Sequence, residues 1–124
     1  MGANAEFKSF SITGAAGAKT IVKFTGNRGE VAPATAATDK IAGVIDLEAT
    51  AAGQMVDVAI ECLHEVVAGA NIAAGDPLTS DANGKAVPAT IAAGLTKHVF
   101  GKALVPAVAG DIFAYLVAPS VIAG

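Results

Sequence analysis

Short apolar runs separated by Gly, Pro, Asn and Asp extend along most of the chain, and no long segment shows the 3.6-residue apolar period of an amphipathic helix. Alternation is clearest over 54–67, where Val56, Val58 and Cys62 share one parity and acidic side chains occupy the other. This pattern is typical of a half-buried strand. It predicts one long strand over 54–67, with Cys62 as a small buried hydrophobe.

Comparable runs predict further short strands along the rest of the chain. These are 7–13, 20–24, 30–32, 41–48, 78–80, 85–87, 98–105 and 111–117. Each of the segments 33–40 and 89–97 is predicted as a loop or a single helical turn. The pattern as a whole indicates an all-β protein, mainly β with at most one or two short helical turns, folded as a small barrel or sandwich.

The stretch 29–60 recurs as 84–117. GEVAPATAAT near the start of the first copy reappears as GKAVPATIAAG, and IAGVIDLEATAAGQMVDVAI reappears as VFGKALVPAVAGDIFAYLV. In this alignment Gly43 matches Gly101, and Val58 matches Tyr115. Such a repeat predicts two quasi-repeated β-units that pack on each other. The repeated residues are Gly, Ala, Pro and aliphatics, so the duplication preserves shape rather than chemistry.

The length of 124 residues suits a single domain with a real core. We expect an extended N-terminal arm over 1–10, a β-rich domain over 11–118 and a C-terminal tail over 119–124. The N-terminus lacks the pattern of a signal peptide, and the apolar run 112–124 is too short to span a bilayer. We therefore expect synthesis in the cytoplasm and no membrane partner.

Composition narrows the possible partners. The chain is 53% hydrophobic, but 29 of its residues are alanine, and only 15% are charged, with a net charge of −3. A nucleic-acid binder would normally carry a clustered basic face, so no nucleic-acid partner is expected. An alanine-rich, charge-poor exterior predicts burial against copies of the chain or against another protein. A compact monomer with an ordinary core remains the alternative.

Candidate catalytic groups are few. His64 and His98 lack metal-ligand spacing, the serines lack a nucleophile motif, and the GAAGAKT stretch over 14–20 departs from a phosphate loop. The single Cys62 excludes a disulfide within the chain. The sequence therefore predicts a protein that is not an enzyme, with no catalytic, cofactor-binding or metal-binding residues and no cofactor.

Two segments resemble a known family. VAGANIAAGDPLTSDANGKAVPA (67–89) and HVFGKALVPAVAGDIFAYLVA (98–118) are similar to the bacteriophage capsid decoration, or cement, proteins, as is 41–60. The family's Gly-Asp-x-Val and Ile-Gly-x-Ala patterns are met with Leu78 in place of Val and Phe100 in place of Ile. The resemblance covers roughly 20–118 and rests on turn motifs rich in small residues.

The resemblance implies a non-enzymatic virion protein on the outer capsid surface, similar in role to the lambda-type head decoration proteins. Such proteins clamp neighbouring major capsid subunits, as trimers at three-fold points. The implied partners are the major capsid protein and the chain itself, as a homotrimer with a dimer also possible.

The unrepeated ends are the expected capsid contacts, because an arm can add an edge strand to a neighbouring sheet. The candidates are Gly2, Ala3, Asn4, Ala5, Glu6, Phe7, Lys8, Val121 and Ile122. Two other functions stay open. One is a non-viral self-assembling shell protein, and the other is a β-barrel binding module, such as a biotinyl-like carrier with Lys85 at a hairpin tip.

Overall fold

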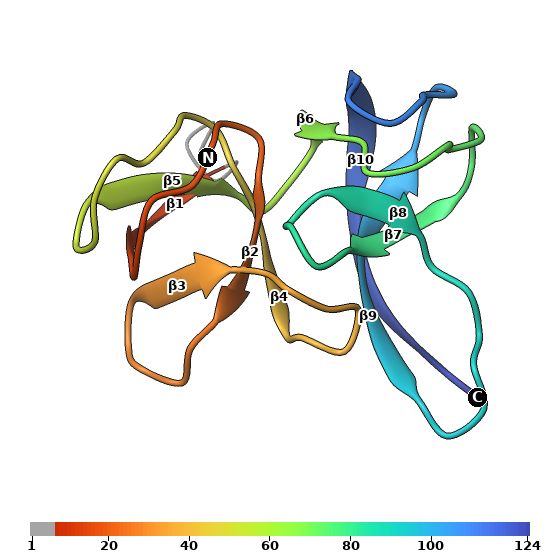
Figure 1. Ribbon diagram of the computed structural model, residues 1–124, viewed down its shortest axis with the longest axis horizontal. Helices are drawn as coiled ribbons and strands as arrows, with labels where there is room; N and C mark the ends of the chain where they lie inside the picture. The colour runs from red at the N-terminus through yellow and green to blue at the C-terminus, as the bar shows by residue number, and fades with distance from the viewer. Residues whose placement is uncertain (1–6) are drawn as a thin grey trace.

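The computed structural model describes residues 7–124, which form ten strands and no helix. The strands make two units of five that lie side by side (Figure 1), and the all-β prediction is confirmed. The first unit contains β1 (Phe7–Ile12), β2 (Ile21–Phe24), β3 (Glu30–Pro33), β4 (Ile41–Ile45) and β5 (Met55–Ala59). The second contains β6 (Leu63–Val67), β7 (Pro77–Ser80), β8 (Ala86–Pro88), β9 (Thr96–Ala103) and β10 (Ile112–Ala123).

The first unit is a closed barrel with the strand order β1-β3-β2-β4-β5. The second unit is an antiparallel sheet with the order β6-β10-β9-β7-β8. These are the same order, read in opposite directions around the sheet. A parallel pairing of β1 with β3 closes the barrel, and one parallel bridge between Ala68 and Ala86 joins the corresponding edges of the second unit.

The two units also share their strand registers. Phe7 pairs with Ala59 as Leu63 pairs with Leu116, and Ile45 pairs with Val58 as Ala103 pairs with Tyr115. The sequence repeat therefore extends in the structure beyond 29–60 and 84–117. β1 and β2 are equivalent to β6 and β7, although their sequences, FKSFSI and IVKF against LHEVV and PLTS, share no identical pair in register.

The first barrel has its own interior, made of branched aliphatic side chains with one aromatic ring. Its buried members are Phe10, Ile12, Val22, Val31, Ile45, Ala49, Val56 and Val58. The core of the second unit is built around Phe100, Phe113 and Tyr115, and it also includes Ile21 and Val44 from the first unit. Because one cluster spans both units, their contact belongs to the hydrophobic core rather than to a loose linker.

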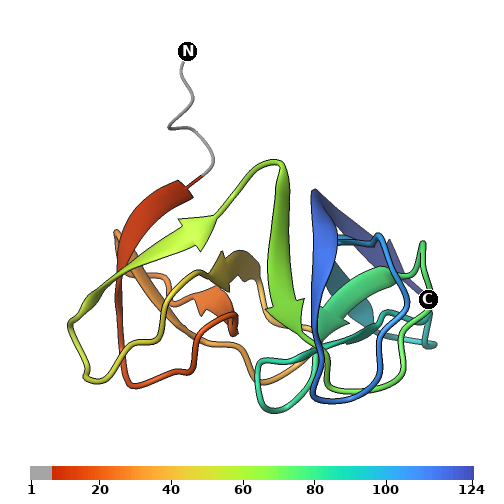
Figure 2. The ribbon, with the colours of Figure 1, turned by 90° about the horizontal axis from the view of Figure 1, so that it is seen from above.

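Backbone hydrogen bonds join the two units as well. The Ile21 N–H donates to the Gly84 carbonyl at 2.8 Å, and the His98 N–H donates to the Ala37 carbonyl at 2.8 Å. The chain crosses from one unit to the other through the short link between β5 and β6 (Figure 2).

The prediction of one strand over 54–67 is wrong at its centre. The alternation holds through Val58, but the chain then leaves the barrel, and the strand breaks between Ala59 and Leu63. Cys62 lies in this break with φ of 70° and is exposed, so the prediction that it is buried is also wrong. Period-two alternation cannot show where a strand passes from one sheet to the next.

Strands extend into both expected chain ends. Phe7–Phe10 belong both to the expected arm and to the predicted strand 7–13, and they pair with β5, with Phe10 buried. The tail over 119–124 was expected to be separate, but β10 continues to Ala123 and pairs with β9 as far as Thr96. A β-bulge after Val117 lets β10 pass Pro119 and resume pairing at Ser120.

Candidate contact surfaces

Gly2, Ala3, Asn4, Ala5 and Glu6, the first group of predicted contacts, lie outside the described residues. Phe7 and Lys8 lie on β1. The Phe7 ring is half-buried and packs edge-on against His64, with 4.8 Å between ring centroids. Lys8 is exposed, with its ammonium 5.8 Å from the centre of the Phe10 ring. Of this pair, only Lys8 is exposed.

The predicted contacts Val121 and Ile122 lie near the open end of the β9–β10 hairpin, where β9 begins and β10 ends. Val121 is 55% exposed, and Ile122 is half-buried. The loop before β9 adds Ile91 and Leu95, which are 71% and 45% exposed, and the Gly124 N–H donates to the Leu95 carbonyl at 3.2 Å. The loop residues Ile91 and Leu95, which the sequence interpretation did not identify, therefore lie next to Gly124 at the C-terminal end of β10.

A second exposed apolar surface lies on the outer face of the second unit. Leu63 on β6 pairs with Leu116 on β10, and Leu104 follows β9 and donates its N–H to the Ala114 carbonyl. Leu63, Leu104 and Ile112 are 58%, 39% and 57% exposed. Sequence reasoning missed these residues, because it treated their apolar character as core. For Ile112 alone, a parity opposite to that of the buried Phe113 and Tyr115 on the same strand was an available signal.

The first unit is polar at one of the equivalent positions and apolar at two others. Asp46 corresponds to Leu104, whereas Phe7 corresponds to Leu63 and Met55 to Ile112, according to the shared register. The Ser9 hydroxyl donates to Asp57 at 3.0 Å. Asp46 shows that the fold accepts a charged side chain at the position of Leu104.

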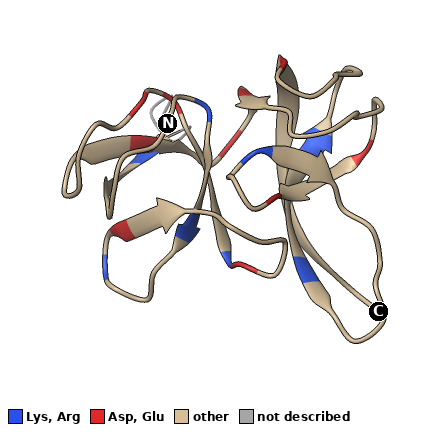
Figure 3. Cartoon of the chain, viewed as in Figure 1, with Lys and Arg blue, Asp and Glu red and all other residues tan. Residues whose placement is uncertain are grey.

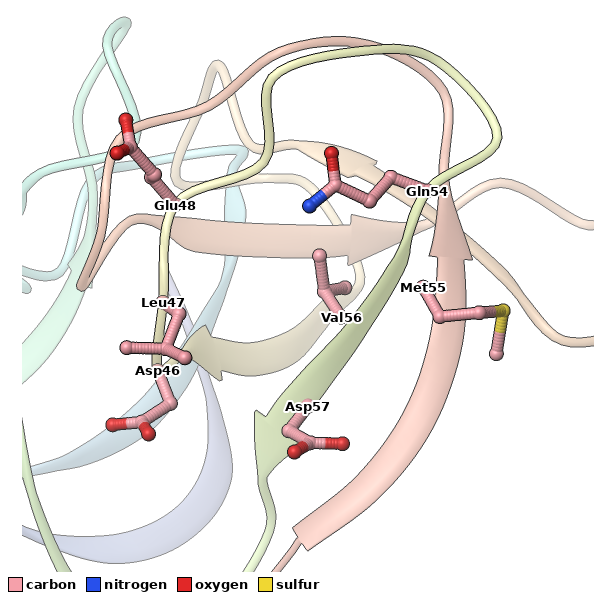
Figure 4. Close-up of a pocket in the computed structure, with 7 residues that line it drawn as sticks. All are labelled: Asp46, Leu47, Glu48, Gln54, Met55, Val56 and Asp57. Atoms are coloured by element: carbon pink, nitrogen blue, oxygen red, sulfur yellow. The ribbon is translucent and has the colours of Figure 1, made fainter.

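A shallow hollow of about 170 Å³ lies on the first unit, lined by residues 46–48 and 54–57. Its carboxylates, from Asp46, Glu48 and Asp57, do not point toward one another (Figure 4). Asp46 is paired with Lys19 at 2.5 Å, and Asp57 accepts the hydrogen bond from Ser9. Without convergent free carboxylates, the hollow lacks the arrangement of an acid–base pair.

A second hollow, of about 120 Å³, lies between the units and has apolar walls that include Ala59, Phe100 and Tyr115. The Tyr115 hydroxyl is buried and has no hydrogen-bond partner among the described residues. Burial raises the pKa of this phenol well above its ordinary value. These apolar surroundings favour a role for Tyr115 in core packing rather than in catalysis.

Charged side chains are scattered over both units rather than gathered on one face (Figure 3). Within residues 7–124, no cluster of three or more His, Cys, Asp or Glu side chains could hold a metal ion. The described part of the chain also contains no helix long and apolar enough to cross a membrane.

Comparison with solved structures identifies a protein of the same fold. The N base of head fiber gp8.5 of bacteriophage phi29 superposes with a TM-score of 0.70, over 90% of this chain and 92% of that one. The two sequences are 21% identical, so the likeness concerns the fold. No protein-family model and no curated protein sequence matches the chain.

Proposed function

We propose that the protein is a non-enzymatic structural component of a bacteriophage virion that binds the outer surface of the capsid. The observation that carries the proposal is the likeness to the head fiber base, which spans nearly the whole of both chains. The described residues are consistent with a structural role, since the exposed groups that stand out are apolar side chains rather than convergent titratable ones.

In this proposal, the protein stabilises the shell by clamping neighbouring major capsid subunits, as decoration proteins do. It acts as a homotrimer. The expected contacts are residues 2–6 with Phe7 and Lys8, and Val121 with Ile122 near the C-terminal end of β10. Val121 supports this assignment best. Its side chain is 55% exposed and lies on a paired strand, so it is both fixed in position and accessible to a partner.

Two variants test the capsid contact. The first removes Gly2–Glu6 only, because a longer deletion would remove strand β1 and the buried Phe10. The second is Val121→Ser with Ile122→Ser. Each is mixed with capsids that lack the protein, and occupancy is measured by sedimentation and cryo-electron microscopy.

The proposal expects lower occupancy for at least one variant, with unchanged melting curves. Leu47→Ser is the matched control, because Leu47 is 73% exposed on the first unit and lies outside both contacts. Absence of the wild-type chain from capsids would refute the function. Full occupancy by both variants would refute these contacts.

A further inference from the structure

The outer face of the first unit is covered by the second unit. Phe7, Ala59 and Val44 lie side by side on this face, because Ala59 pairs with both of the others. Ala59 and Val44 are only 3% and 1% exposed, and Val44 belongs to the same hydrophobic cluster as Tyr115. The second unit thus supplies the cover that this row of apolar side chains requires.

The equivalent row on the second unit is uncovered. It consists of Leu63, Leu116 and Lys102, which form the same pairs in the same register. Leu63 and Lys102 are exposed, and Leu116 is half-buried. We call this row the receiving face. The end unit of a repeat array normally presents a polar outer surface, whereas Leu104 and Ile112 extend the apolar surface beside this row.

The residues that make the internal contact also have equivalents on the first unit. The second unit meets the first through Gly84, whose carbonyl accepts from Ile21, and through His98, which donates to Ala37. Their equivalents, Gly29 and Lys40, are exposed. We call the surface formed by Lys8, Arg28, Gly29 and Lys40 the covering face. The first unit therefore has exposed equivalents of the two residues whose backbones bind the first unit from the second.

The charges of the two faces are complementary. The covering face carries three cations, Lys8, Arg28 and Lys40, with the carboxylates of Glu30 and Asp39 next to them in the chain. The receiving face carries one, Lys102, and is flanked by the carboxylates of Glu65 and Asp76. Cations brought toward carboxylates favour this pairing of faces over the pairing of either face with itself.

The internal contact predicts which charges meet. A Cβ on Gly84 would lie 2.7 Å from Cγ2 of Thr20, so the Gly84 turn is in direct contact with the start of β2. The equivalent of Thr20 in the second unit is Asp76, and the equivalent of Gly84 is Gly29, which follows Arg28. Repeating the contact between two molecules therefore brings Arg28 of one copy close to Asp76 of the next.

We propose that the receiving face of one molecule binds the covering face of a second copy of the same chain, head to tail, in the arrangement that the two units adopt within one molecule. Such an interface is heterologous, so each molecule uses two different surfaces. The inference deepens the self-association in the proposed function and does not depend on capsid binding.

The test uses one variant for each face. Leu63→Asp places a charge on the receiving face, and Arg28→Glu reverses a charge on the covering face. The full-length wild-type chain, each variant and an equimolar mixture of the two are followed by sedimentation velocity over about a hundredfold range of concentration. Leu47→Asp is the control, because Leu47 is also an exposed leucine and lies outside both faces. Circular dichroism melting curves verify that each variant folds.

We expect the wild type and the control to associate, and each face variant to associate at least about tenfold more weakly. The mixture is the decisive sample. Leu63→Asp keeps an intact covering face and Arg28→Glu keeps an intact receiving face, so together they form a dimer that neither forms alone. A monomeric wild type, or a mixture no larger than its separate components, overturns the proposal.

Capsid occupancy separates this inference from the proposed function. A monomeric wild type whose occupancy on capsids falls with Leu63→Asp would assign the receiving face to the capsid and overturn self-association. Head-to-tail association without any capsid occupancy would support this inference and refute the proposed function.

Discussion

Gly101 lies directly against Tyr115, and no side chain could be added to it without displacing that ring. A Cβ on Gly101 would come within 2.7 Å of Cδ2 of Tyr115 and 2.5 Å of the Leu116 carbonyl oxygen. The first unit repeats this relationship between Gly43 and Val58, where a Cβ would lie 2.8 Å from a valine methyl carbon. The duplicated glycines thus fix the close approach of the fourth and fifth strands in both units.

Gly101→Ala is expected to lower the free energy of unfolding by about 1–3 kcal/mol, because the added methyl group must push aside a backbone carbonyl and a buried ring. Gly14→Ala is the matched control. A Cβ on Gly14 meets nothing within 4 Å, so that variant should be neutral or slightly more stable. Urea unfolding measures both. Equal stability of the two variants would contradict the close approach described here.

Tyr115 predicts a loss of stability at alkaline pH. Burial raises the pKa of its phenol in the folded state. The stability that the buried, protonated phenol contributes is therefore fully present below the ordinary tyrosine pKa of about 10. Above that pH the unfolded chain releases the proton and the folded chain keeps it. Stability then falls by up to about 1.4 kcal/mol per pH unit.

The chain has one tyrosine and no tryptophan, so tyrosinate absorbance reports on Tyr115 alone. Folded protein should show no tyrosinate at a pH where the urea-unfolded chain is fully ionised. Tyr115→Phe should remove this part of the alkaline destabilisation while keeping the edge-on ring contact with Phe100, 5.1 Å away. A phenol that titrates at its ordinary pKa in the native protein would show that the ring is not buried.

The positive φ of Cys62 leads us to expect that substitutions at this position change the stability of the fold. Its φ of 70° is costly for a residue with a Cβ. Cys62→Val should reduce the free energy of unfolding by about 1–2 kcal/mol, because a β-branched side chain tolerates this conformation poorly. Cys62→Gly should cost nothing or add a little stability, since glycine adopts this φ freely.

The same residue provides an independent chemical measurement. Cys62 is exposed, so a thiol reagent should label it in the native protein about as fast as in the unfolded chain. Labelling that requires unfolding would contradict the exposed position between β5 and β6.

Much of the fold could be predicted from the sequence, because the relevant signals were local. Glycine and proline marked the turns, and the repeat over 29–60 and 84–117 indicated two similar units. The equivalence of β1 and β6 could not be predicted, since Ser9 and Glu65 share only a backbone position. Their pairing partners are distant in sequence, and no local pattern records such contacts.

The candidate surfaces were less predictable. Val121 was identified because it follows the repeat, and it is exposed in the structure. Leu63 and Leu104 were not identified, because an exposed leucine and a buried one look the same in a sequence. Only the register relating Leu104 to Asp46 shows that the fold can carry a charge at this position.

The central claim is that this chain is a structural protein of the phage capsid surface, and the most direct test is cryo-electron microscopy of phage particles produced with and without it. The account predicts additional density on the outside of the shell, fitted by the two five-stranded units, that is absent from particles lacking the protein. Identical shells in both samples, with the protein left in the unbound fraction, would contradict it.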